Sequence, residues 1–271
     1  MDRANPRRWA PLARQGNPGR RGEAGLPEAI RPVLKNEPIP PPPAPAWQRL
    51  NWPGVWAPLA AFGAYLLAAL IFGVAGMTYA LSRGHPSDAL PKITVLAWSN
   101  LGALVVLGAV SLVLLAGANP GRGPGVLARL AGDIERRDWL LVGVLFVAVV
   151  PAELMLAIAL GGRIPMDPVL IEALSHPASK LGAVLVAPVS EELWGRGLVY
   201  GTLSRWGPWV ALAGTTLITS FIHLDPLHML TVLPGMAAMS WLRFKTGRLA
   251  PSVALHAANN LFSVLGSSLV P

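Results

Sequence analysis

The sequence predicts an all-α membrane protein, a polytopic bundle of about seven transmembrane helices that follows a disordered N-terminal tail. Of its 271 residues, 53% are hydrophobic and 13% are charged, whereas a soluble globular protein carries about 25% charged residues. The apolar residues lie in long continuous blocks, a pattern that is typical of membrane spans. The chain has no cysteine, which excludes disulfides, thiolate metal ligands and a cysteine nucleophile.

Residues 1–52 are the first predicted element, a disordered basic tail. They are rich in Pro, Gly and Arg, include the run Pro40–Pro43, and contain too few apolar side chains to bury a core. Residues 1–50 hold nine Lys or Arg against four acids, a large part of the formal net charge of +8. Because most other basic residues lie between apolar blocks, the charge indicates membrane orientation, and we exclude nucleic acid as a partner.

Seven apolar segments make up the second predicted domain, residues 53–271. A span needs about 20 apolar residues to cross a hydrocarbon core of about 30 Å, and the first four segments and the last reach that length. The fifth and sixth segments are shorter, at roughly 16–17 residues each. The segments are 56–82, 94–117, 139–161, 181–203, 208–224, 228–243 and 248–270.

The distribution of Lys and Arg predicts a cytoplasmic N-terminus. With the N-terminus inside, the inner tail and loops carry 17 Lys or Arg, Arg243 and Arg248 among them, and the outer loops carry 4. Basic residues accumulate on the cytoplasmic side of membrane proteins. We therefore expect the N-terminus inside and the C-terminus outside.

The fourth segment carries three charged residues near its middle, Glu191, Glu192 and Arg196. On membrane-insertion scales each costs about 2.5–3.5 kcal/mol, so together they oppose insertion by roughly 8–10 kcal/mol. Glu192 and Arg196 are four residues apart and can pair on one helix face, whereas Glu191 points about 100° away and is free for chemistry. The segment therefore predicts a polar interior with a function; the alternative is a purely structural ion-pair cluster.

Further polar residues in other apolar segments predict one shared site, because histidine and asparagine need polar partners in lipid. The residues that predict it are His223, His256 and Asn260; Asp225 and His228 lie in a turn, where water can hydrate them, and carry less weight, and Glu153 is a further acid within an apolar segment. His256 and Asn260 share one helix face. His223 ends the fifth segment, and His228, in the turn after it, is the alternative site histidine. Glu153 either lines the cavity or bonds to a neighbouring helix, and we favour the supporting role.

These residue types suit hydrolysis of an amide bond within a membrane. A carboxylate in apolar surroundings suits a general base for water, and His and Asn can donate hydrogen bonds to an oxyanion. Glu191, His223 and His256 are also an adequate ligand set for zinc. The compact His-Glu-x-x-His motif is absent, so a metal-dependent and a metal-free route both stay open. We expect these three residues and Asn260 to meet at one water-filled pocket.

The order of these motifs resembles the CPBP family of intramembrane proteases, which includes the type II CAAX prenyl endopeptidases and bacteriocin-immunity (Abi-like) relatives. The family's two glutamates and arginine stand here as Glu191-Glu192-Leu193-Trp194-Gly195-Arg196. Its Phe-x-x-x-His motif falls on residues 219–223, where Thr219 replaces the aromatic residue, and its His-x-x-x-Asn motif begins at His256. The resemblance covers residues 178–262.

By that resemblance the protein is a hydrolase, an intramembrane protease of the metalloprotease or glutamate-dependent type. Its implied substrate is a membrane-associated peptide or protein, with a prenylated CAAX substrate as one candidate, and a divalent metal such as zinc is the one cofactor implied. The implied catalytic residues are Glu191, Glu192, Arg196, His223, His256 and Asn260. Among them, Glu191 would activate water, Asn260 would hold the oxyanion, and the Glu192–Arg196 pair would brace the site.

Two other functions stay open. A non-catalytic membrane immunity or scaffold protein can keep the same fold, and an ion or proton transporter can use the same buried polar residues as a relay. The chain shows no internal repeat, which weakens the transporter hypothesis. In each case we expect a multi-pass protein of a bacterial inner membrane, surrounded by lipid, and the sequence does not predict its oligomeric state.

Overall fold

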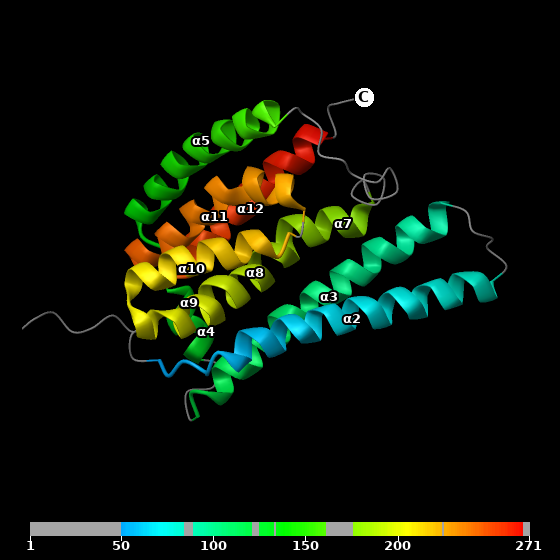
Figure 1. Ribbon diagram of the computed structural model, residues 1–271, viewed down its shortest axis with the longest axis horizontal. Helices are drawn as coiled ribbons and strands as arrows, with labels where there is room; N and C mark the ends of the chain where they lie inside the picture. Colours follow the sequence, from blue (N-terminus) through cyan, green and yellow to red (C-terminus); the bar gives the residue numbers. More distant parts are fainter. Residues whose placement is uncertain are drawn as a thin grey trace, which may run out of the picture. The chain divides into compact units, whose positions relative to one another are not determined.

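The computed structural model describes residues 50–83, 89–120, 125–132, 134–160, 176–223 and 225–267, and the predicted tail of residues 1–52 lies almost wholly outside these ranges. Within them the chain is helical and contains no strand, which confirms the all-α prediction (Figure 1). The first half holds the long helices α2 (Trp56–Ser82), α3 (Ala89–Gly117) and α5 (Arg136–Ala159). A short helix that the sequence did not predict, α4 (Gly125–Ala131), precedes α5.

The fourth predicted segment is a continuous helical run interrupted by two wide π-helical turns. Its parts are α7 (Pro177–Leu181), the π-helical η3 (Gly182–Val186), α8 (Ala187–Glu192), the π-helical η4 (Leu193–Val199), α9 (Tyr200–Leu203) and the 3₁₀ turn η5 (Ser204–Trp206). π-helical turns are rare and occur frequently at functional sites. Here they flank α8, the element that carries both predicted glutamates.

Three further helices complete the described part, α10 (Pro208–Phe221), α11 (Pro226–Thr246) and α12 (Ala250–Ser267). Proline stands in the first turn of α10 and of α11, where its missing N–H would have no partner within the helix. The Asp225 side chain caps α11 by accepting a hydrogen bond from the His228 N–H at 2.8 Å. The helix ends at Gly247, whose φ of +67° is a left-handed conformation that favours glycine.

Each of the seven predicted segments coincides with a helix or with the helical run, but seven spans are not confirmed. In the described ranges, three helices are long and apolar enough to cross a membrane, Trp56–Ser82, Lys92–Gly117 and Arg136–Ala159, and Pro208–Phe221 is apolar but shorter. The remaining segments carry charged and polar side chains, which lowers their hydropathy. The three long apolar helices are nevertheless sufficient to make the chain an integral membrane protein.

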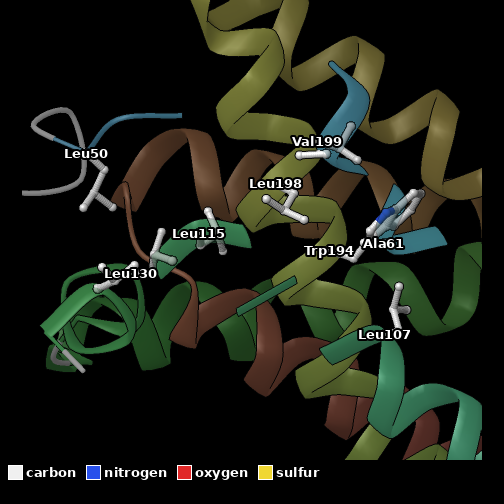
Figure 2. Close-up of a cluster of buried hydrophobic side chains, with 10 residues drawn as sticks. Leu50, Ala61, Leu107, Leu115, Leu130, Trp194, Leu198 and Val199 are labelled. Atoms are coloured by element: carbon white, nitrogen blue, oxygen red, sulfur yellow. The ribbon is translucent and has the colours of Figure 1, made fainter. Parts of the chain in front are cut away.

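The helical run from α7 to α9 is packed on two sides. Helix α3 contacts α8 and η4, and its partner α2 contacts η4. Helices α10 and α12 contact the run from the other side, and α5 packs against α11 and α12 (Figure 1). Figure 2 shows an apolar cluster in which Trp194 and Leu198 of η4 lie among Ala61, Leu107 and Leu115. A second apolar cluster joins α5, α11 and α12. The run that carries the predicted glutamates thus belongs to the first cluster and contacts α12 of the second.

Candidate active site

Glu192 is the centre of a buried network. Its side chain is 0% exposed, and its Oε1 accepts hydrogen bonds from Arg196 Nη1 at 2.8 Å and from His256 Nδ1 at 3.0 Å. The ion pair predicted from the four-residue spacing is therefore present. Because a carboxylate only accepts hydrogen bonds, the proton of neutral His256 lies on Nδ1. Glu192 thus fixes both the position and the tautomer of a histidine that lies 64 residues further along the chain.

Arg196 extends this network into α11. Its Nη2 donates to the carbonyl oxygen of Met236 at 2.8 Å, and its own carbonyl oxygen accepts from Arg243 Nε at 3.1 Å. Arg243 is fully buried, lies over the Tyr200 ring at 5.6 Å and donates to the Gly247 carbonyl. The topology predicted from the sequence has Arg243 in a cytoplasmic loop. The structure corrects this assignment, because α11 continues beyond Arg243 and turns its side chain inward.

Glu191 is the accessible carboxylate of the pair. Its side chain is 26% exposed, and its Oε2 lies 3.9 Å from His256 Nε2. His256 therefore stands between the two glutamates, with Nδ1 on Glu192 and Nε2 towards Glu191. This arrangement matches the prediction that one carboxylate is held by an arginine and the other points elsewhere. With Nδ1 protonated, Nε2 keeps a lone pair on the side of Glu191.

His223 lies at the end of α10 and reaches towards the same region. Its Nδ1 lies 3.1 Å from the Thr219 carbonyl and 3.3 Å from the Ser220 carbonyl, so Nδ1 carries the proton and Nε2 can accept. The His223 ring interacts electrostatically with His256. A Cβ atom added to Gly195 would lie 2.8 Å from Thr219 Cγ2. The small side chain of Thr219, where the family motif has an aromatic residue, lets α10 lie directly against η4.

The two other polar residues of this turn have visible local partners. Asp225 caps α11 through the His228 N–H, a structural role. The His228 ring packs edge-on against the His223 ring, with centroids 4.9 Å apart. The sequence leaves the choice between the two histidines open. The described contacts do not decide between them, and His223 stays the predicted site residue.

Asn260 connects α12 to the π-helical turn η3. Its Nδ2 donates to the Ala183 carbonyl oxygen at 2.8 Å. A π-helical turn shifts the backbone hydrogen bonds by one residue, and a side-chain donor can satisfy a carbonyl oxygen there. The Asn260 side-chain amide has two N–H groups, so this bond leaves the second one for another acceptor.

Glu153 has the supporting role that we favoured from the sequence, with Asn259 as a partner that sequence reasoning missed. Asn259 Nδ2 donates to Glu153 Oε2 at 3.0 Å, and the Gly235 N–H donates to Glu153 Oε1 at 3.2 Å. Gly235 comes directly after Pro234 inside α11. A helix-interior proline disturbs the hydrogen-bond pattern of its turn, and in this turn the Gly235 N–H donates to a side chain. Glu153 therefore joins α5, α11 and α12.

The described residues do not fit the implied metal site. No group of three or more His, Asp or Glu side chains in residues 50–267, apart from the gaps named above, is arranged to hold a metal ion. The set Glu191, His223 and His256 is thus not a ligand cluster in this geometry. A pocket of about 530 Å³ lies between Leu50–Trp52 and the segment from Tyr200 to Pro208, and none of the four residues expected to converge lines it.

One known protein family matches the part of the chain that carries this network. Residues 174–262 match the sequence model of the family described as type II CAAX prenyl endopeptidase Rce1-like. The matched region runs from before α7 into α12 and contains all three motifs, which confirms the predicted resemblance to CPBP proteases. Comparison with curated proteins and with solved structures finds no match.

Proposed function

We propose that the protein is an intramembrane endopeptidase in which Glu191 is the general base, since residues 174–262 match the family model described as type II CAAX prenyl endopeptidase Rce1-like. The observation that carries the proposal is the contrast between the two neighbouring glutamates. Glu192 is fully buried and neutralised by Arg196, whereas Glu191 is partly exposed and lies beside His256. A carboxylate that is accessible within an apolar protein is suited to taking a proton from water.

The proposed reaction begins with a water molecule beside Glu191. The Glu191 carboxylate removes one proton while the water oxygen attacks the carbonyl carbon of the substrate peptide bond. The other water hydrogen donates to a histidine Nε2 lone pair, on His256 or His223. Both histidines are oriented for this task, because the proton of each lies on Nδ1. Glu192 and Arg196 do not react; they hold His256.

The tetrahedral intermediate places a negative charge on the former carbonyl oxygen. The second N–H of Asn260 is a suitable donor to that oxyanion, since its first N–H is held by Ala183. When the carbon–nitrogen bond breaks, the Glu191 carboxylic acid returns its proton to the leaving amine. The products are a carboxylic acid and an amine, which exchange a proton to become a carboxylate and an ammonium group, and Glu191 is again ionised. This route balances with water as the single co-reactant and uses no metal ion.

The proposed substrate is a membrane-associated peptide, and a prenylated C-terminal CAAX segment is the first one to test. The family description names such substrates, and the apolar helices α2, α3 and α5 support a substrate that is itself held in the membrane. We propose the orientation that the basic tail and loops favour, with the N-terminus in the cytoplasm of a bacterial cell.

The test uses the purified full chain in proteoliposomes with a farnesylated peptide that ends in a CAAX sequence, and mass spectrometry of the products. We expect release of the C-terminal tripeptide, and a decrease in its rate of about 10²–10⁴-fold in Glu191→Gln, the range for loss of a general base. The unfolding midpoint of this variant should match that of the parent protein. A Glu191→Gln variant as active as the parent would refute the proposed base, and a stable parent without cleavage would refute the protease itself.

A further inference from the structure

A polar pair lies on the two N-terminal spans, outside the matched residues 174–262. The Tyr65 hydroxyl donates to Asn100 Oδ1 at 3.3 Å, which links α2 to α3. Both residues lie in helices that are apolar enough to cross a membrane. Tyr65 is half-buried and Asn100 is exposed. An exposed carboxamide within an apolar span is costly, and such residues commonly serve binding or transport.

The contacts of α2 direct Tyr65 towards Glu191. Trp194 Nε1 donates to the Pro58 carbonyl at 2.8 Å, and the Phe62 and Trp194 rings lie 5.5 Å apart. Pro58, Phe62 and Tyr65 succeed one another at about one-turn spacing on one face of α2, and Trp194 lies three residues after Glu191. One turn beyond Phe62, Tyr65 interacts electrostatically with Glu191.

Helix α3 approaches the same place from its own side. A Cβ atom added to Gly108 would lie 2.7 Å from Ser190 Oγ, so the α3 backbone passes directly beside the residue that precedes Glu191. Asn100 lies about two turns before Gly108 on this helix, at the level of Tyr65. The α2–α3 pair thus brings Tyr65 to the side of Glu191, and Asn100 is the hydrogen-bond partner of Tyr65 on α3.

We propose that Tyr65 and Asn100 bind the backbone of the substrate peptide beside Glu191, an inference that rests on the proposed function. A peptide in an apolar site needs partners for its N–H and C=O groups. The Asn100 carboxamide offers both a donor and an acceptor, and the Tyr65 hydroxyl offers a second polar contact. The exposure of Asn100 leaves its side chain accessible to a peptide, while Tyr65, packed on Phe62 at 5.8 Å between ring centroids, is held in place.

The competing explanation is that this hydrogen bond only stabilises the packing of α2 against α3, as polar pairs between membrane helices do. The two explanations differ in the properties that the variants change. Loss of a purely structural hydrogen bond lowers the free energy of unfolding and leaves substrate affinity unchanged. Loss of a backbone contact weakens substrate binding while the turnover rate of bound substrate stays the same.

The test measures Kd for the farnesylated CAAX peptide by fluorescence anisotropy in the Glu191→Gln background, which removes turnover from the measurement. We expect Tyr65→Phe and Asn100→Ala each to raise Kd by about 3- to 10-fold, the range for one lost hydrogen bond. The matched control is Tyr79→Phe, which removes the same hydroxyl from an exposed position of α2 (64% exposed). It should leave Kd unchanged.

A second peptide, N-methylated at the amide groups flanking the scissile bond, identifies the contact. The parent should bind it about 3- to 10-fold more weakly than the unmethylated peptide, whereas Asn100→Ala should bind both equally. Equal Kd values for Tyr65→Phe, Asn100→Ala and Tyr79→Phe would overturn this inference even if the parent cleaves the peptide. If the parent does not cleave the peptide but Tyr65→Phe and Asn100→Ala still raise Kd, the proposed protease activity is refuted and the proposed binding site is not.

Discussion

Replacing Arg196 by methionine tests the network that holds His256. Arg196 donates to Glu192 and to the Met236 carbonyl, each at 2.8 Å, and both charged side chains are at most 1% exposed. Removing one partner of a buried ion pair leaves an uncompensated charge and costs about 3–5 kcal/mol. We therefore expect Arg196→Met to lower the free energy of unfolding by that amount. The assay is reversible unfolding in mixed micelles with increasing sodium dodecyl sulfate, monitored by tryptophan fluorescence.

The double variant Glu192→Gln with Arg196→Met separates the buried charge from lost packing. The amide oxygen introduced at residue 192 can still accept from His256 Nδ1, and no unpaired carboxylate remains. We expect the double variant to be more stable than Arg196→Met alone by at least about 1 kcal/mol, the lower bound for an unsatisfied buried group. Arg129→Met, at an exposed site of α4, is the control and should change stability by less than about 0.5 kcal/mol. If the changes in unfolding free energy of Glu192→Gln and Arg196→Met simply add up to that of the double variant, the reasoning is refuted.

Three further outcomes are expected from the described contacts. Gly195→Ala should cost about 1–3 kcal/mol of unfolding free energy because its Cβ would crowd Thr219, and the added change Thr219→Ser should recover most of this in the same unfolding assay. Glu153→Gln should lower the free energy of unfolding by about 1 kcal/mol, because the new side-chain amide faces the Asn259 amide. Adding Asn259→Asp should restore the hydrogen bond and the lost stability. A double variant no more stable than Glu153→Gln would contradict the pairing. Dialysis against a chelator should leave the peptide cleavage rate unchanged, because no three His, Asp or Glu of the described chain meet as ligands; a loss that zinc restores would contradict this.

The helices could be predicted from the sequence because their apolar blocks are long and their ends carry strong signals. The segment predicted at 56–82 has the bounds of α2, and Pro208, Pro226 and Gly247 mark helix ends by backbone geometry alone. The number of spans was not predictable in the same way. A segment such as 181–203 is helical, but its charges prevent composition from saying whether it spans.

Within the site, contacts set by local spacing could be predicted from the sequence, and contacts set by tertiary packing could not. The Glu192–Arg196 pair is a four-residue spacing on one helix and was predictable. The Glu153–Asn259 bond joins residues 106 positions apart, and no local pattern encodes it. The one available signal was the pair Asn259-Asn260, since adjacent residues on a helix face different directions and each asparagine needs its own partner.

The irregular helices and the buried charges of this domain depend on each other. Regular helices satisfy their backbone carbonyl and N–H groups internally, which leaves no partners for charged side chains in a lipid environment. Here the two π-helical turns present the Ala183 and Arg196 carbonyls to side-chain donors, and the Gly235 N–H, next to Pro234, donates to the Glu153 carboxylate. These contacts offset the insertion cost of the buried charges. They also leave Glu191 as the partly exposed acid of α8, while Arg196 forms its salt bridge with Glu192, an arrangement that suits the proposed general base.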